Sequence, residues 1–145
     1  MSYTFHSVLE KEAYWDWVAQ RAGTVKCMNS RGFIALRDNG DIDAGVAFDN
    51  WTKTSCGTHI AIENPFVLRH GFLEEVARYV FDVCDRKIIV GFTPGDNEAA
   101  LRFNRKIGWV EIARIPDGQD HGVELVIQTM RPDQCRYYRG QANGR

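Results

Sequence analysis

Two side chains that can accept protons lie on one face of a short predicted strand. The run from Thr58 to Glu63 alternates so that His59 and Glu63 share a face, while isoleucines occupy the other face. Imidazole and carboxylate groups are frequent general bases in enzymes. At strand spacing the two residues are roughly 13 Å apart, which is too far for a direct dyad. Each is therefore a separate candidate base, and a solvated strand face is an equally good interpretation.

The cysteines and histidines do not form a metal-binding or redox motif. No C-x-x-C pair occurs, and neither residue type clusters along the sequence. Zinc sites and redox dithiols need closely spaced ligands. We therefore expect no metal ion, and reduced thiols at the four cysteines, which are Cys27, Cys56, Cys84 and Cys135.

A short basic helix is predicted over the run N-E-A-A-L-R-F-N-R-K-I-G-W, which starts at Asn97. The Asn97 side chain can accept a hydrogen bond from a free amide of the first turn. Gly108 can adopt the positive φ that ends a helix. Apolar residues recur at helical spacing at Ala100, Phe103 and Ile107. The helix also carries three basic residues, which suit phosphate groups or simply face solvent: Arg102, Arg105 and Lys106.

Length and composition predict one globular domain. The chain has 145 residues, of which 44% are hydrophobic and 26% are charged. A chain of this length can bury roughly two thirds of its unfolded surface. The net charge of −1 gives no general attraction to nucleic acid or to membranes. No apolar run is long enough to span a bilayer, and the first residues lack a secretory signal pattern, so a cytoplasmic location is expected.

The N-terminal half is predicted to contain one helix and three strands. Ser7 and Glu10 form a capping-box pattern ahead of a helix that Gly23 ends. A D-N-G-D run favours a tight turn, and an apolar run on each side of it favours a β-hairpin. The two hairpin strands are expected at residues 33–37 and 42–49. A polar loop over 50–57 and a third strand over 58–63 follow.

The C-terminal half is predicted to alternate strands and helices before a final pair of strands. Apolar residues at helical spacing predict a helix over 72–85. A strand over 87–92 and the basic helix over 97–107 follow. The two final strands are expected at residues 109–115 and 123–130. The tail over 131–145 is expected to fray. This order predicts a single domain over 1–145 of the α/β (α+β) class, with a mixed, mostly antiparallel sheet and helices on both faces.

The order of elements and the run that starts at Asn97 resemble the GCN5-related N-acetyltransferase family, whose members transfer acetyl from acetyl-CoA to amines. The resemblance extends from Ser7 to Met130. The C-terminal turn, strand and Met-Arg ending are similar to the branch that includes ribosomal-protein acetyltransferases, and to short acetyltransferase-like proteins of bacteriophages. The most specific matches are to the family's common Asn, Ala, apolar, Lys, Gly and aromatic positions, at Asn97, Ala100, Phe103, Lys106, Gly108 and Trp109.

The resemblance implies a sheet of the acyl-CoA N-acyltransferase type and an acetyl-CoA site just before the helix at residue 72. The family has a glycine-rich loop there whose amides hold the pyrophosphate, and free amides at a helix N-terminus favour anions in general. Gly71 is the only family glycine kept, although Arg69 and His70 could add cationic donors. An ordinary helix start with a solvated Arg and His is the alternative. The implied cofactor-binding residues are Phe66, Val67, Leu68, Arg69, His70, Gly71, Phe72, Asn97, Ala100, Phe103 and Lys106.

The resemblance also implies catalytic roles. An amine acceptor must lose a proton at neutral pH, and the family often takes the base from the strand over 58–63, which makes Glu63 the first candidate and His59 the second. Backbone amides of 66–68 would polarise the thioester carbonyl. Many members protonate the leaving thiolate with a Tyr where this sequence has Asn104. An amide cannot supply that proton, so we expect slower turnover or an acid from elsewhere.

Two functions are consistent with these residues. The first is an enzyme that moves acetyl from acetyl-CoA to a primary amine of a small molecule or a protein by direct attack. The alternative is a catalytically weak or inactive binding module of the same fold, which could still hold CoA. The expected partners are acetyl-CoA and an unidentified amine, with no membrane and no strong signal for nucleic acid. A homodimer is left open.

Overall fold

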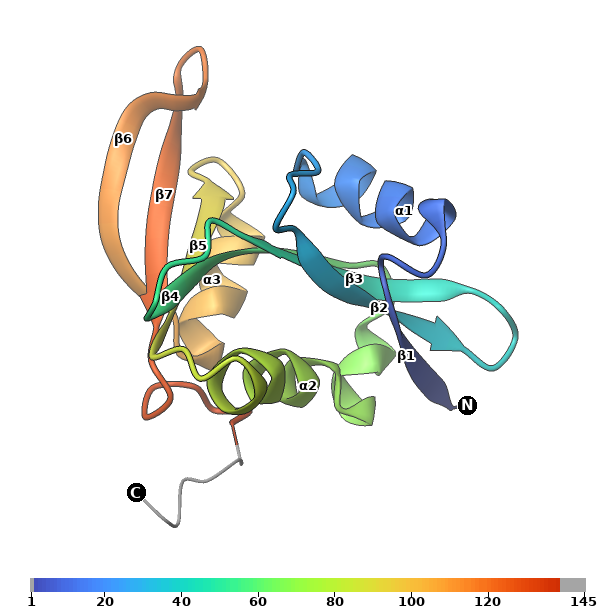
Figure 1. Cartoon of the computed structure of the whole chain (residues 1–145). Helices are drawn as coiled ribbons and strands as arrows, with labels where there is room; N and C mark the ends of the chain where they lie inside the picture. The colour runs from blue at the N-terminus through green and yellow to red at the C-terminus, as the bar shows by residue number, and fades with distance from the viewer. Residues whose placement is uncertain (1, 139–145) are drawn as a thin grey trace.

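The computed structural model describes residues 2–138 and contains a seven-stranded sheet with helices on both faces (Figure 1). The strands are β1 (Tyr3–Ser7), β2 (Arg31–Arg37), β3 (Ile42–Asp49), β4 (Ser55–Ile62), β5 (Ile88–Pro94), β6 (Val110–Asp120) and β7 (Val123–Met130). The helices are α1 (Glu12–Ala22), the 3-10 helix η1 (Pro65–His70), α2 (Phe72–Arg78), its π-helical continuation η2 (Tyr79–Val83) and α3 (Glu98–Ile107).

The sheet has the order β1-β2-β3-β4-β5-β7-β6. Neighbouring strands are antiparallel except β4 and β5, which are parallel. Parallel neighbours need a long crossover, and α2 lies in that connection. The mixed, mostly antiparallel sheet predicted from the sequence is therefore confirmed.

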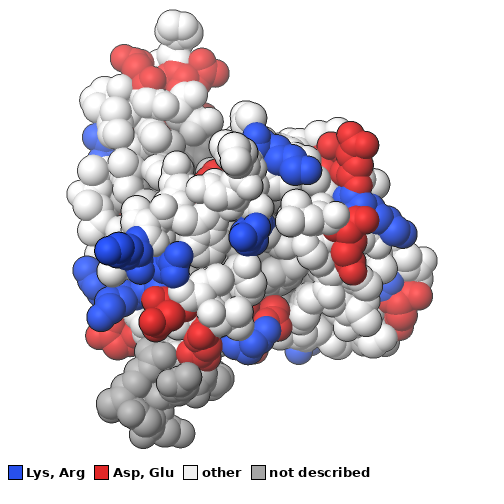
Figure 2. All heavy atoms as spheres, viewed as in Figure 1, with Lys and Arg blue, Asp and Glu red and all other residues white. Residues whose placement is uncertain are grey.

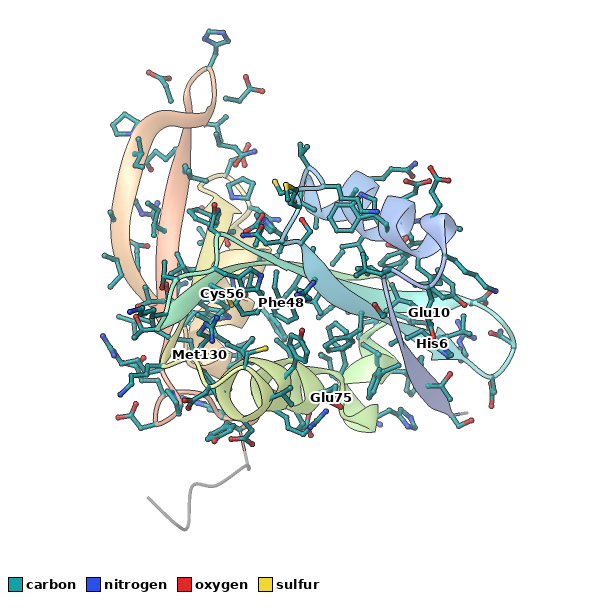
Figure 3. The ribbon with its side chains drawn as sticks, in the orientation of Figure 1. His6, Glu10, Phe48, Cys56, Glu75 and Met130 are labelled. Carbon is teal, nitrogen blue, oxygen red and sulfur yellow. The ribbon has the colours of Figure 1, made fainter. Side chains whose placement is uncertain are left out.

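Helix α1 covers one face of the sheet, and α2 and α3 cover the other. The buried side chains of α1 form one core with Ile34 and Ala47 of the sheet. A second, larger core lies between the sheet and α2 and contains Phe48 and Met130, which are labelled in Figure 3. Ile107 near the end of α3 belongs to this second core. The sheet thus separates two hydrophobic cores, one covered by α1 and the other by α2 and α3.

The N-terminus differs from the sequence prediction, because residues 3–7 form β1 instead of leading into a helix. Ser7 is the last residue of β1 and lies opposite Phe33 of β2. Helix α1 begins only after Lys11 and has no side-chain cap. The capping box predicted at Ser7 and Glu10 is therefore wrong, because long-range strand pairing overrides a local helix signal. Gly23, with a φ of 68°, ends α1 as predicted.

Strands β4 and β6 extend into runs that were expected to be loops. Strand β4 begins at Ser55, inside the run 50–57 that was expected to be a loop. Strand β6 continues to Asp120 through Pro116. β6 is an edge strand, and an edge position tolerates proline because half of its amides have no partner strand.

The described part of the C-terminal tail packs against the rest of the fold. Cys135 and Tyr138 are buried, and the Tyr138 hydroxyl donates a hydrogen bond to Asp82. The Tyr138 ring also packs edge-on against Phe81. The expected fraying of the tail over 131–145 stays a prediction, and residues 139–145 lie outside the described part of the chain.

Close approaches at two glycines pack the end of α3 and the residue after Gly108 against the rest of the molecule. Gly108 ends α3 with a φ of 118°, as predicted, and a Cβ there would lie 2.0 Å from the carbonyl oxygen of Gln134. The next residue, Trp109, packs over Gly91 of β5, where a Cβ would lie 2.9 Å from the indole ring. Both positions need glycine because neighbouring atoms occupy the space of a side chain.

Charged side chains of both signs are distributed over the face shown in Figure 2. Acidic side chains gather at the tip of the β6–β7 hairpin, where the sequence places Asp117 and Asp120, and basic side chains gather near the base of that hairpin. Among the described residues, no helix combines the length and the apolar character needed to cross a membrane.

Candidate active site at a fork in the sheet

The sheet opens into a fork between its two parallel strands. The pairing of β4 with β5 ends at Thr58 and Gly91, although β4 continues to Ile62 and β5 continues to Pro94. Figure 1 shows the two strands diverging beyond this point. In a strand, backbone amide and carbonyl groups point alternately to the two neighbours. Half of those groups in residues 59–62 of β4 therefore face the open side of the fork instead of a partner strand.

A histidine and an aspartate form a close pair at the apex of this fork. His59 is the first residue of β4 beyond the paired segment. Its Nε2 lies 2.8 Å from Oδ2 of Asp49, the last residue of β3. The side chains are only 18% and 13% exposed. The pair is therefore shielded from most of the solvent.

Phe92 lies beside the histidine ring, and Gly57 leaves space for the aspartate side chain. The imidazole of His59 stacks on the ring of Phe92, the first residue of β5 beyond the paired segment, with ring centroids 6.1 Å apart and planes inclined by 19°. Gly57 lies opposite Asp49, and a Cβ at Gly57 would come within 2.6 Å of Asp49 Oδ1. The missing side chain at Gly57 gives the carboxylate room to lie over β4.

Glu63, the first base candidate from the sequence, lies away from this pair. It follows the end of β4, is 62% exposed, and forms an ion pair with Arg21 at 3.4 Å. It lines an open groove of about 480 Å³ that also includes Arg37 and Asp43. Because it is solvated and lies beyond the strand, Glu63 has no contact in the structure that would place it at the apex of the fork.

The lining of the groove includes the buried carboxylate of Asp43, which is hydrogen-bonded to neighbouring side chains. Asp43 accepts hydrogen bonds from Arg37 at 2.8 and 3.0 Å and from the Tyr3 hydroxyl at 2.6 Å. The Arg37 guanidinium, together with the Tyr3 hydroxyl, lowers the pKa of Asp43 below its usual range. Burial and the Asp43 carboxylate raise the pKa of Tyr3 to about 12. This cluster is a structural clamp between β1, β2 and β3 and does not offer a free base.

The amides proposed to polarise a thioester carbonyl are occupied within η1. The Phe66 amide donates to the side-chain oxygen of Asn64 at 3.1 Å, and the Val67 amide donates to the Asn64 carbonyl at 3.1 Å. Val67 is buried and Leu68 packs against the larger core. The amides of Phe66 and Val67 thus already have acceptors within the fold, and an oxyanion role for the backbone of residues 66–68 stays a prediction.

The start of α2 keeps some features of an anion site and lacks others. Gly71 has a φ of 87° and open space around it, and no side chain caps the first amides of α2. Arg69 and His70 are exposed, with Arg69 over the Phe66 ring and His70 beside the Tyr3 ring. Phe72 is fully buried, so only its backbone could contact a ligand.

Acidic residues weaken this anion site. The first turn of α2 carries Glu74 and Glu75, and the helix itself has only seven residues. Negative charges near a helix N-terminus oppose a phosphate through direct repulsion. Glu75 is paired with Arg78, which removes part of that repulsion.

Helix α3 places its predicted residues in different environments. Asn97 is the N-cap, and its side-chain oxygen accepts from the Ala100 amide at 3.1 Å. Phe103 packs against the larger core, whereas Lys106 is exposed. The exposed residues Arg102 and Arg105 lie on the same helix, so the basic surface predicted from the sequence exists.

Asn104 belongs to a buried polar cluster. Its amide donates to Gln128 Oε1 at 3.0 Å and to Thr93 Oγ1 at 3.3 Å, and the Thr93 hydroxyl donates to the same Gln128 oxygen at 3.2 Å. Gln128 is 1% exposed, and its Nε2 has no partner among the described residues. Both amide hydrogens of Asn104 are thus directed at protein groups and not at the fork.

Helices α2 and α3 leave little free space between them. A narrow apolar crevice of about 10 Å³ lies there. Its lining includes Ile60, Leu73, Val76, Ile107, Trp109 and Met130. A ligand arm at the fork would therefore lie along its open edge, since the interior below is filled by the chain's own side chains.

Sequence reasoning missed the partner of His59. Asp49 and Gly57 come from the end of one predicted strand and from a predicted loop, and neither has a local motif that links it to His59. The one available signal is the length of the β3–β4 connection. If β4 starts at Ser55, antiparallel pairing sets Asp49 opposite Gly57 and diagonal to His59.

Comparisons of sequence find no relatives: no protein-family model matches the chain, and no curated protein matches it. Comparisons of structure do find similar proteins. A spermidine N-acetyltransferase SpeG chimera from Vibrio cholerae and hSSAT has a TM-score of 0.69 at 10% identity, over 90% of this chain and 96% of that one. SpeG from Vibrio cholerae in complex with manganese ions has a TM-score of 0.66 at 11% identity, over 90% and 92%.

A third similar structure, a protein described as a probable acetyltransferase, has a TM-score of 0.60 at 17% identity over 87% of this chain and 73% of that one. At such low identity the likeness concerns the fold. The chain has the fold of the GCN5-related N-acetyltransferases, as the sequence resemblance predicted. The branch within that group stays a prediction.

Proposed function

We propose that this chain is an N-acetyltransferase that moves acetyl from acetyl-CoA to a primary amine. The observation that carries the proposal is the fork between β4 and β5, with a carboxylate-anchored imidazole at its apex. The acetyltransferase neighbours support acyl transfer as the reaction class. In this arrangement the carrier approaches from the side of α2 and α3, and the amine approaches from the side of α1.

The residues at the fork fit the chemistry of acetyl-CoA. The pantetheine arm of CoA carries two amide groups, which can pair with the free edge of β4 over residues 59–62 as an added strand does. The uncapped amides after Gly71 and the nearby Arg69 and His70 suit the pyrophosphate. The side-chain oxygen of Asn97 already caps α3, so only its amide nitrogen is left for the carrier.

The reaction needs one proton acceptor and one leaving group. The amine nitrogen attacks the thioester carbonyl carbon, the carbon–sulfur bond breaks, and the amine proton passes to a base. The thiolate leaves with the electron pair of that bond and takes a proton from solvent. A thiol has a pKa of roughly 8.5, so this departure does not require a protein acid. That matters here because the Asn104 amide is used within the fold.

The geometry favours His59 over Glu63 as the base. His59 lies at the first unpaired position of β4, partly shielded from solvent and anchored by Asp49. Glu63 lies beyond the strand in an exposed ion pair with Arg21. A base must reach the attacking nitrogen, so position decides between the two candidates before basicity does.

A non-catalytic CoA-binding module is the second candidate. Two observations favour it: the crevice between α2 and α3 is narrow, and acidic residues occupy the first turn of α2. In that case the chain would bind the carrier without releasing thiol.

Binding and turnover measurements separate these functions. Acetyl-CoA at about 100 times its Kd should stabilise the protein by about 2.7 kcal/mol, seen as a rise in Tm. Thiol release should then follow on adding an amine, and the panel should contain spermidine, small alkylamines and short peptides with free N-termini. Stabilisation without thiol release indicates the binding module. No response to millimolar acetyl-CoA refutes both functions.

Substitutions of the two candidate bases then test the assignment. We expect His59→Gln to lower kcat by about 10²- to 10⁴-fold, the usual effect of removing a general base, with the affinity for acetyl-CoA retained. Glu63→Gln is the matched control and should leave kcat nearly unchanged. The reverse result would assign the base to Glu63.

A further inference from the structure

We infer that Asp49 is the positioning residue of the active site, and that it makes Nδ1 of His59 the atom that takes the proton from the amine. The inference rests on the proposed function, because it names the proton acceptor of that reaction. It concerns two residues, Asp49 and Gly57, to which no sequence motif assigns a role. Its basis is the geometry of the β3–β4 pair next to the fork.

The contact between Asp49 and His59 selects one form of the imidazole. An ionised carboxylate only accepts hydrogen bonds, so Nε2 of His59 must carry a hydrogen to bond Asp49 Oδ2 at 2.8 Å. In a neutral imidazole the other nitrogen then holds the lone pair. No described residue bonds Nδ1. Nδ1 is thus the nitrogen that is ready to accept a proton.

The same carboxylate offsets the charge that proton transfer creates. When Nδ1 takes the amine proton, the ring becomes a cation whose Nε2–H still points at Asp49. Because both side chains are largely shielded from water, the attraction between them is stronger than at an exposed site. The hydrogen bond from Nε2 to Asp49 fixes the direction of the two nitrogens, and the Phe92 ring lies nearly parallel to the imidazole beside it.

The space at Gly57, a hydrogen bond from Asn50 and the backbone bend at Asn50 set the position of the carboxylate. Gly57 leaves room for Oδ1, which would lie 2.6 Å from a Cβ at that position. The Asn50 side chain donates to the same oxygen at 3.4 Å. Asn50 adopts a φ of 47°, a conformation that Asn tolerates better than most residues, and this bend turns the chain directly after Asp49. The local backbone thus presents Oδ2 to the histidine.

The chain contains a second histidine–carboxylate pair that serves as a control. His6 Nδ1 lies 3.0 Å from Glu10 Oε2, with the side chains 31% and 52% exposed. Figure 3 shows this pair at the end of the molecule near β1, far from Cys56, which marks the paired part of β4. It has a similar contact but lies outside the fork, so its loss should not affect the reaction.

Kinetics of three variants test the positioning role, with acetyl-CoA and the amine of the panel that gives the fastest thiol release. Asp49→Asn keeps the shape of the side chain but presents an amide, which favours the wrong imidazole tautomer. We expect kcat to fall by about 10²-fold or more and the KM for acetyl-CoA to stay unchanged. Asp49→Glu should recover part of the lost rate. Glu10→Gln should behave as wild type.

A double variant separates positioning from a general structural effect. If Asp49 acts through His59, adding Asp49→Asn to His59→Gln should cause no further loss of kcat. Equal losses in both backgrounds would show that Asp49 acts independently, and would overturn the inference. Wild-type kcat in Asp49→Asn would overturn it as well.

Nitrogen-15 NMR of the histidine side chains tests the tautomer without any turnover. In the wild type above neutral pH, the His59 signals, identified by their loss in His59→Gln, should show a protonated Nε2 and an unprotonated Nδ1. Asp49→Asn should shift the population toward the other tautomer. A wild-type signal with hydrogen on Nδ1 would refute the inference. Because this readout needs no substrate, it stands even if the chain proves to be the binding module.

Discussion

At the scale of single residues, the fork combines a histidine, an aspartate and a glycine whose roles depend on one another. The imidazole alone could take either tautomer, the carboxylate alone could turn away, and the glycine alone would be an ordinary strand residue. Their register fixes the combination, since Asp49 lies opposite Gly57 and next to the strand position of His59. The proposed functional unit is thus a short piece of the β3–β4 ladder.

Substitution of Gly57 tests this dependence. Gly57→Ala places a Cβ where Asp49 Oδ1 now lies, and the flexible carboxylate can move away at little cost. Alanine restricts the unfolded chain more than glycine, so the free energy of unfolding should stay level or rise by about 0.5–1 kcal/mol. Activity should fall, because the displaced carboxylate no longer orients His59. Urea unfolding and steady-state kinetics measure the two effects.

The control for this variant is the same change without the carboxylate. In an Asp49→Ala background, Gly57→Ala should have no further effect on kcat, since nothing is left to displace. A loss of activity in that background would mean that the alanine disturbs β4 itself.

Roles that depend on neighbours in the sequence were predicted correctly, whereas contacts between residues far apart in the chain were not. Asn97 and Gly108 were predicted correctly as helix cap and helix end, because capping depends on residues within one turn. His59 was recognised as a titratable residue on a strand, but its partner lies ten positions earlier in the chain and becomes visible only with the strand register. Asn104 looked like a substitution at a catalytic position, whereas its contacts with Thr93 and Gln128 come from two other strands.

At the scale of elements, the fold was predictable where the pattern was local and strong. The hairpin strands around the D-N-G-D turn and the final strand β7 match the structure closely. The first strand was missed because it has only five residues and its partner strand β2 lies far along the chain. No residue near 3–7 indicates that pairing. The strands that follow β1 in the chain form the sheet, and β1 is a strand because it pairs with the edge of that sheet at β2.

The clamp of Asp43, Arg37 and Tyr3 joins three of these strands and predicts a pH dependence of stability. The pKa of Asp43 is lowered in the folded state, so the unfolded state binds its proton more readily. The stabilisation is therefore present above the ordinary aspartate pKa of about 3.9 and is lost as the pH falls below it. The pKa of Tyr3 is raised to about 12, so stability should also fall as the pH rises from about 10 through 12.

Asp43→Asn removes the acidic part of this dependence. We expect a loss of about 1.5–3 kcal/mol at neutral pH, because Arg37 loses a charged hydrogen-bond partner, and a flatter stability curve below pH 4. Urea unfolding at several pH values measures both effects. The exposed Asp16 provides the control in Asp16→Asn. An unchanged acid slope in Asp43→Asn would assign the acid sensitivity to other carboxylates.

At the scale of the whole molecule, the sheet divides the proposed reaction between two faces. Helices α2 and α3 cover one face and α1 covers the other, and the fork is the place where the sheet lets the two sides meet. A carrier lying on the α2 and α3 side can present its thioester at the apex, while the histidine pair lies among residues that face α1. Such a division keeps the amine and the carrier from competing for one surface.

Hydrogen exchange measures this division directly. In the free protein, the amides of residues 59–62 that face the fork have no strand partner and should exchange quickly. Acetyl-CoA should slow exchange there and in residues 71–74 at the start of α2, because it supplies acceptors to those amides. Helix α1 should not respond to the carrier and should gain protection only when CoA and the amine are both present. Protection of α1 by acetyl-CoA alone would place the carrier on the face of the sheet that α1 covers. His59 would then lie on the wrong side of the thioester to take the proton of an incoming amine.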